Sequence, residues 1–159
     1  MSTELEIVLT PSGYARIEKE LDRLRTVDRH NVADRIRDAK AFGEFAENAE
    51  YEDAKNEQAI VEGRIQELKR ILQSSQILQD EDIPVDTAGI GSKVTIVDLD
   101  TDDVWEFTMV GFVESDPDND MISDESPIGK ALFGLKVGDS VDVTVPDGHV
   151  RYRIENIRK

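Results

Sequence analysis

Apolar residues in the first half of the chain recur at alternating spacings of three and four positions. The longest unbroken run with this spacing consists of Tyr51, Ala54, Gln58, Val61, Ile65, Leu68 and Leu72, of which only Gln58 is polar. An earlier run slips near Asp28 and consists of Tyr14, Ile17, Leu21, Leu24, Val32, Ile36 and Ala39. This spacing is typical of the seam of a coiled coil.

Two helices are expected, one over residues 11–42 and one from about residue 48 to residue 72. Thr10 can cap the first helix, Pro11 suits its first position, and Gly43 can end it. Because only a few residues separate the two helices, they must fold back on each other as an antiparallel hairpin. The acidic tip of this hairpin, residues 43–51, carries Glu44 and Glu47 at its apex.

From residue 83 onward the helical period disappears and short strands predominate. Strands are expected at residues 93–97, 104–113, 140–145 and 149–157, with a bulge at Gly111 and a loop at 116–120. Ser126, Pro127 and Gly134 mark the cap, first turn and stop of one short helix. The predicted fold class is therefore α+β. A coiled-coil hairpin domain, residues 1–80, is followed by a small, mostly antiparallel sheet domain, residues 81–159.

Composition narrows the range of functions. The chain has 35 acidic and 19 basic residues and a net charge of −16, which disfavours unassisted nucleic-acid binding through phosphates. It has no cysteine, which excludes disulfides, zinc–thiolate sites and cysteine nucleophiles. Its N-terminus lacks the order of a secretion signal, and no run approaches the ~18 apolar residues of a membrane span. We expect a soluble, cytoplasmic protein with no membrane partner.

Glu44 and Glu47 form the first candidate site. Glu50, Glu52 and Asp53 are close in sequence, and such crowding of like charges is mildly destabilising, which suggests a purpose other than stability. Carboxylate oxygens suit Mg2+, which takes one or two protein carboxylates and keeps water or phosphate in its other positions. Two glutamates alone make a poor metal site, and the alternative is a solvated, charged turn.

Four cations near the apex form the second candidate site. They are Arg35, Arg37, Lys40 and Lys55. They could pair along the helices with Asp34, Asp38 and Glu52, or they could contact phosphate groups. The sequence leaves both interpretations open. No aromatic residues interleave with them in the manner that stacks single-stranded bases.

Several separate segments, in one order, carry a family resemblance. They are residues 9–14, 47–51, 54–58 with 62–65, 122–123, 126–134 and 138–139. Through them the chain resembles the bacterial Gre transcript-cleavage factors, a family of transcription elongation factors, and most closely the GreA type. The resemblance extends over essentially the whole chain.

The resemblance implies a C-terminal domain of FKBP-like fold that docks on bacterial RNA polymerase. It implies that the hairpin enters the secondary channel, where Glu44 and Glu47 act as catalytic residues that hold Mg2+ jointly with the polymerase. The isolated chain is expected to be a monomer, to bind no metal stably and to be an accessory factor, not an enzyme. Contacts with the nascent RNA 3′ end are implied for Lys40, Lys55 and Arg37. Polymerase contacts are implied for Ser126, Pro127, Ile128, Gly129, Leu132 and Gly134.

One tip position departs from the family pattern. Glu44 stands where the family usually has aspartate, which keeps the charge but adds a methylene, and ~1 Å of misplacement can cost on the order of 100-fold in rate. The alternative is therefore that the chain is a Gre-like paralogue. Such a protein would occupy the channel and inhibit or modulate the polymerase without efficient cleavage. A third, from another class, is a chaperone or prolyl isomerase that uses the FKBP-like domain.

Overall fold

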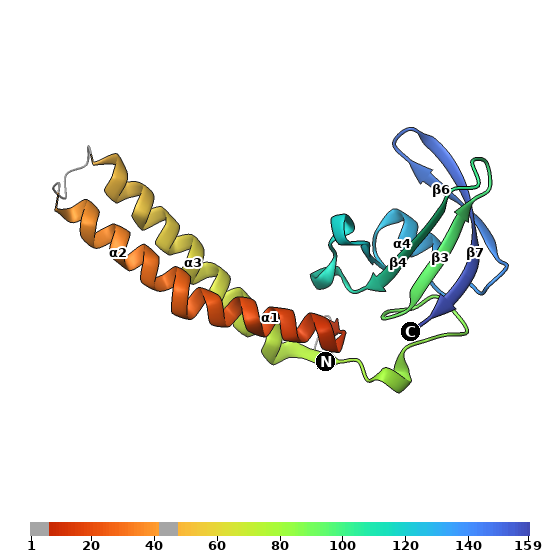
Figure 1. Ribbon diagram of the computed structural model, residues 1–159, viewed down its shortest axis with the longest axis horizontal. Coiled ribbons are helices and arrows are strands. Elements are labelled where there is room, and N and C mark those ends of the chain that lie inside the picture. Colours follow the sequence, from red (N-terminus) through yellow and green to blue (C-terminus); the bar gives the residue numbers. More distant parts are fainter. Residues whose placement is uncertain (1–6, 42–47) are drawn as a thin grey trace, which may run out of the picture. The chain divides into compact units, whose positions relative to one another are not determined.

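The computed structural model of this chain describes residues 7–41 and 48–159 (Figure 1). Its internal contacts divide the chain into two compact units. Tyr14–Ser75 form the helical unit, and Gln76–Lys159 with the chain up to Gly13 form the sheet unit. Contacts thus assign the first residues of the predicted 1–80 domain to the sheet unit. No described helix is long and apolar enough to cross a membrane.

The helical unit is an antiparallel hairpin, as predicted. Its first arm runs without a break through α1 (Pro11–Arg23), a π-helix (Leu24–Asp28) and α2 (Arg29–Lys40). Its second arm is the single helix α3 (Ala49–Ser74). Figure 1 shows α2 and α3 lying side by side with opposite chain directions. The end predicted for the first helix, residue 42, lies outside the described residues.

The slip in the apolar rhythm near Asp28 has a structural cause. Val32 follows Leu24 by eight positions, one more than an unbroken rhythm of three and four allows. The π-helix Leu24–Asp28 lies between them, and its wider turn takes up one extra residue. Leu24 and Val32 are consequently both buried, at 9% and 2% exposure. The seam continues across the slip.

The seam of α3 follows the prediction except at its end. Its buried residues are Ala54, Val61, Ile65, Leu68 and Ile71. Leu72, predicted as the last seam position, is half-buried, and Ile71 is buried at the base of the hairpin instead. Ion pairs flank the seam and join the two arms, with Glu20 contacting Arg64 and Glu62 contacting Arg29. These pairs are exposed, so each contributes at most ~1 kcal/mol.

Gly63 offers a simple way to stabilise the hairpin. It lies within α3, and a β-carbon built on it meets no atom within 4 Å. Glycine inside a helix is less favourable than alanine by about 1 kcal/mol. We expect Gly63→Ala to raise the free energy of unfolding of the hairpin by about that amount, measured by far-UV circular dichroism in denaturant. An unchanged or lower stability would mean that this face of α3 packs against something.

The sheet unit is built on a five-stranded sheet in the order β5-β4-β3-β7-β6. Its strands are β3 (Lys93–Asp98), β4 (Val104–Val110), β5 (Met121–Ser123), β6 (Ser140–Val145) and β7 (Gly148–Arg158). The neighbours pair antiparallel except for β4 and β5, which are parallel. Helix α4 (Pro127–Leu132) follows β5 along the chain. The α+β fold class is confirmed.

Two details of the predicted sheet are wrong. Gly111 is not a bulge, because β4 ends at Val110 and the chain turns into a 3-10 helix at Phe112–Glu114. The irregularity lies in β7, where Thr95 of β3 pairs with Asn156 and Ile96 pairs with Ile154, which leaves Glu155 unpaired. The extra residue accounts for the spacing of three between the buried Ile154 and Ile157. The short strand β5 lies in a segment to which the sequence analysis assigned no element.

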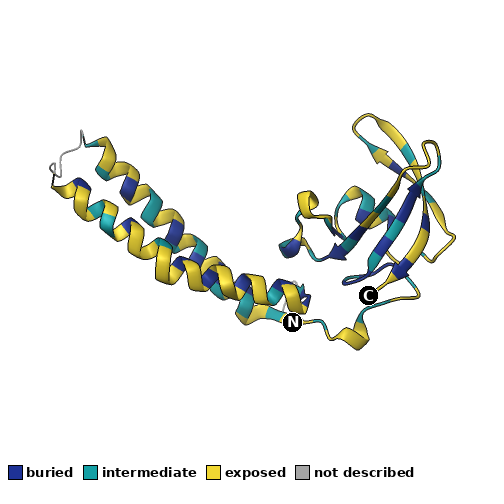
Figure 2. Ribbon diagram, in the orientation of Figure 1, coloured by how far each residue is buried: buried dark blue, intermediate teal, exposed yellow. Residues whose placement is uncertain are grey.

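The core of the sheet unit joins the central strands to α4. Figure 2 shows buried positions following β3, β4 and β7. The buried core consists of Ala88, Val94, Ile96, Phe107, Met109, Ile122, Leu132, Ile154 and Ile157. Leu132 is fully buried, so α4 is fastened to the sheet by its own apolar side chain.

The start of α1 is held within the sheet unit by a buried acid. Thr10 caps the helix as predicted, since its hydroxyl oxygen accepts the Gly13 N–H at 3.0 Å. The Glu114 carboxylate accepts both the Thr10 N–H at 2.9 Å and the Thr10 hydroxyl at 2.7 Å. Just before this cap, β1 (Ile7–Leu9) pairs with β2 (Ser75–Ile77) in a separate small sheet. These contacts explain why the chain up to Gly13 belongs to the sheet unit.

Candidate functional site

The apex of the hairpin is organised by Asn48. Its side-chain carbonyl accepts the Tyr51 N–H at 3.1 Å, which caps α3 close to the start that the sequence predicted. Its side-chain NH2 donates to the backbone carbonyl of Ala39 at 2.9 Å. One side chain thus contacts both arms where they approach the acidic tip. Glu44 and Glu47, the predicted catalytic and metal-binding residues, lie in the segment 42–47, outside the described residues.

The cations near the apex differ in their partners. Arg37 makes ion pairs with Asp34 at 3.1 Å and with Asp38 at 3.8 Å, so the predicted pairing along the helix is confirmed for this residue. Arg35 pairs instead across the hairpin with Glu57. The exposed Lys55 ammonium donates to the Gln58 side chain at 3.2 Å, and Lys40 is also exposed.

Ion pairing also shifts the titration of one acid on the hairpin. Arg29 donates two hydrogen bonds of 2.8 Å to the Glu62 carboxylate. These bonds hold the pKa of Glu62 below its usual value, and they raise the pKa of Arg29. Both side chains remain about half exposed to solvent, so the pairing fixes side-chain geometry more than it stabilises the fold.

Helix α4, the predicted polymerase-binding element, presents only part of its sequence to solvent. Ser126 caps it by accepting the Gly129 N–H at 3.1 Å, which confirms the predicted start. Gly129 and Leu132 are buried, and Ile128 is half-buried against the core. The Leu132 side chain and the Gly129 backbone are therefore covered and cannot contact a partner directly in this structure. Pro127 and Gly134 are exposed, as the interpretation required.

Two features near α4 were missed from the sequence. Phe133 is 52% exposed beside Gly134, and Phe112 is 71% exposed after the end of β4. The signal for Phe112 was available, because a large apolar residue directly follows Gly111, where the strand pattern ends.

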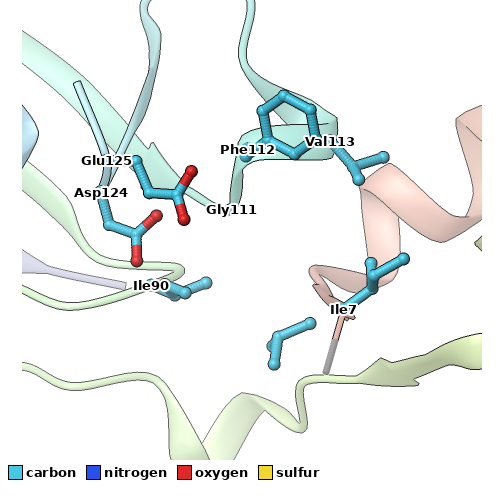
Figure 3. A pocket seen from close by; sticks show the side chains of 8 residues that line it. Ile7, Ile90, Gly111, Phe112, Val113, Asp124 and Glu125 are labelled. Atoms are coloured by element: carbon cyan, nitrogen blue, oxygen red, sulfur yellow. The ribbon is translucent and has the colours of Figure 1, made fainter. Parts of the chain in front are cut away.

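Phe112 lies at a small hollow in the sheet unit. The hollow has a volume of about 140 Å³ and is lined by Ile7, Val8, Ile90, Gly111, Phe112, Val113, Asp124 and Glu125. Figure 3 shows the carboxylates of Asp124 and Glu125 on one side, facing the apolar side chains of Ile7 and Val113. A hollow with an apolar lining and an acidic side favours an apolar partner segment with basic residues beside it.

Comparison with known families gives two matches in tandem. The family described as transcription elongation factor, N-terminal, matches residues 7–77. The family described as transcription elongation factor, GreA/GreB, C-terminal, matches residues 83–159. The two matches meet near the transition from helices to strands.

Individual relatives match over nearly the full length. The chain is 49% identical over 159 residues to the transcription elongation factor GreA of Acetivibrio thermocellus, covering 100% of both chains. It is 48% identical over 153 residues to the GreA factor of Thermoanaerobacter pseudethanolicus, covering 96% of this chain and 98% of the relative. The solved structure of GreA factor homolog 1 from Thermus thermophilus is 30% identical with a TM-score of 0.46, over 98% of this chain and 100% of that one.

Proposed function

This chain belongs to the GreA/GreB family of transcription elongation factors, and we propose from this premise that it stimulates transcript cleavage by bacterial RNA polymerase. In this proposal the hairpin enters the secondary channel of the polymerase and brings its tip to the active site. The polymerase then hydrolyses the 3′ end of a backtracked transcript, and elongation resumes. The factor acts as a cytoplasmic monomer and is not an enzyme by itself.

The closed apex of the hairpin carries this proposal. Both arms continue to the tip, to Lys40 on one side and from Ala49 on the other, and Asn48 joins them. The sequence between the arms contains Glu44 and Glu47. Two helices that support each other along a seam can present a short acidic segment at the end of a long arm. This arrangement suits delivery of carboxylates into a narrow channel.

The chemistry of the tip fits a shared Mg2+ ion. Within residues 7–41 and 48–159, no group of three or more His, Asp or Glu side chains could hold a metal. Two carboxylates are too few to hold this ion alone, so Glu44 and Glu47 would complete a site whose other ligands come from the polymerase. The ion would stabilise the attacking and leaving oxygens of phosphodiester hydrolysis. Lys40, Lys55 and Arg37 would contact the nascent RNA.

The direct test uses backtracked elongation complexes of the cognate polymerase in the presence of magnesium. Adding the protein should yield shortened RNA that the polymerase can extend again. The alternative, a channel-occupying inhibitor, is supported by Glu44 at the usual aspartate position. In that case the protein should slow RNA synthesis and produce no shortened RNA.

Docking is assigned in this proposal to the exposed residues around α4. We expect Phe133→Ser to weaken polymerase binding about tenfold, or ~1.4 kcal/mol, since an exposed aromatic residue that becomes a buried anchor of an interface contributes at least this much. Competition with the unlabelled parent protein for polymerase measures this change.

The matched control for the docking test is Val104→Ser. Val104 is 67% exposed on the same unit and lies at the start of β4, outside the proposed surface. Its substitution should leave affinity unchanged. If both variants bind like the parent, the docking surface lies elsewhere on the protein.

A further inference from the structure

We infer that Asn48 is a positioning residue that clamps the two arms of the hairpin together and so sets the separation that residues 42–47 have to span. Its consequence for transcript cleavage rests on the proposed function. The clamp itself rests on two hydrogen bonds, from Asn48 to Ala39 and from Tyr51 to Asn48. No family comparison assigns this role.

The two bonds place different demands on the side chain. Capping α3 needs only an acceptor, and asparagine, aspartate and serine serve about equally well there. The bond to the Ala39 carbonyl needs a donor at the same time. An amide supplies an acceptor and a donor on one rigid plane, whereas an ionised aspartate has no donor. Capping alone therefore does not select asparagine at position 48, but the second bond does.

The Ala39 carbonyl is a suitable partner for the clamp. It belongs to the last turn of α2, and it also accepts the backbone N–H of Ala41, the residue that follows the helix. The amide of Asn48 adds a second donor from the other arm, since a carbonyl oxygen can accept two hydrogen bonds. Ala39 and Ala54 are both buried, at 6% and 0% exposure, so small side chains line the seam near the tip. The clamp thus joins two backbones that small residues allow to approach closely.

The clamp lies next to the proposed chemistry. Glu47 immediately precedes Asn48 in the sequence, so the position of Asn48 determines where the tip segment enters α3. A displacement of ~1 Å in a reacting arrangement can cost on the order of 100-fold in rate. Loss of the clamp should therefore lower the maximal cleavage rate without changing how tightly the factor binds polymerase.

Asn48→Ser should keep one hydrogen bond and remove the other, because serine can cap α3 but lacks the amide donor that contacts Ala39. The chain has no cysteine, so cysteines introduced at the exposed Asp38 and Asp53 can carry spin labels in the full-length protein. Pulsed electron paramagnetic resonance then measures the distance distribution between the arms. We expect Asn48→Ser to broaden this distribution while the thermal midpoint stays unchanged. Asn56→Ser, the same substitution at an exposed site farther along α3, should leave the distribution as in the parent.

Cleavage kinetics complete the test. Asn48→Ser should lower the rate at saturating factor by at least about tenfold and leave the half-saturating concentration unchanged. A distance distribution identical to that of the parent would overturn the clamp, whatever the cleavage rate. A broadened distribution with full cleavage would overturn the positioning role. If the parent stimulates no cleavage, the proposed function fails, but the distance measurement still decides whether the clamp exists.

Discussion

Glu47→Ala should lower stimulated transcript cleavage by roughly 100-fold or more, because it removes one of two carboxylates proposed to hold a shared metal ion. Folding and polymerase binding should persist, since the substitution leaves every residue of the described seam and sheet core unchanged. Part of the loss should be recovered at high magnesium concentration, because mass action then compensates for a weakened site. Single-turnover cleavage of backtracked RNA measures the rate.

Two further variants make this result specific. Glu50→Ala removes an acid of the same tip that is exposed at the start of α3, and it should cleave nearly as well as the parent. Glu44→Asp restores the side-chain length usual in the family and should keep or raise activity. If the parent is inactive and Glu44→Asp gains cleavage, the inhibitory function replaces the proposed one. Equal cleavage by the parent, Glu44→Ala and Glu47→Ala would show that the tip carboxylates take no part.

Gly129→Ala should destabilise the sheet unit by about 3 kcal/mol, the upper end of the usual cost of overpacking. A β-carbon at this position would lie 1.9 Å from the backbone oxygen of Ser123. That oxygen cannot give way cheaply, because Ser123 belongs to β5 and also accepts the Ser126 hydroxyl at 2.6 Å. The midpoint of thermal unfolding should fall by more than ~10 °C.

The chain carries a built-in probe for this measurement. Its one tryptophan, Trp105, lies on β4, packs against the core of the sheet unit and donates to Asp120 at 2.9 Å. Trp105 fluorescence therefore follows the sheet unit, whereas far-UV circular dichroism is dominated by the hairpin. Gly63→Ala is the control and should leave the Trp105 transition unchanged. An unshifted transition in Gly129→Ala would mean that α4 can move off β5 without cost.

Local sequence patterns determined most of the helical unit. The spacing of apolar residues predicted two long helices, and the slip near Asp28 marked the place where the structure has a π-helix. The caps at Thr10, Asn48 and Ser126 were predictable too, because a cap depends on residues only three positions away. The family motifs added the interpretation of Glu44 and Glu47, whose geometry lies outside the described residues.

Long-range contacts determined the features of the sheet unit that the sequence did not predict. The three-residue strand β5 exists because it pairs with β4, and the Glu155 bulge exists because β7 must keep both Ile154 and Ile157 buried against β3. Pairing partners of this kind are distant in the chain and leave no local signal. The same reason explains why α4 turns Leu132 into the core and leaves Phe133 exposed.

By itself, then, the sequence determined the hairpin, its seam and caps, and the family to which its tip belongs, because each depends on short-range periodicity or contiguous motifs. Only the tertiary structure showed that Thr10 donates a hydrogen bond to the buried carboxylate of Glu114, 104 positions away. It likewise showed that Asn48 donates to the carbonyl of Ala39 on the opposite arm. Both are hydrogen bonds between segments that meet only after folding. Their partners are defined by packing in three dimensions and not by spacing along the chain.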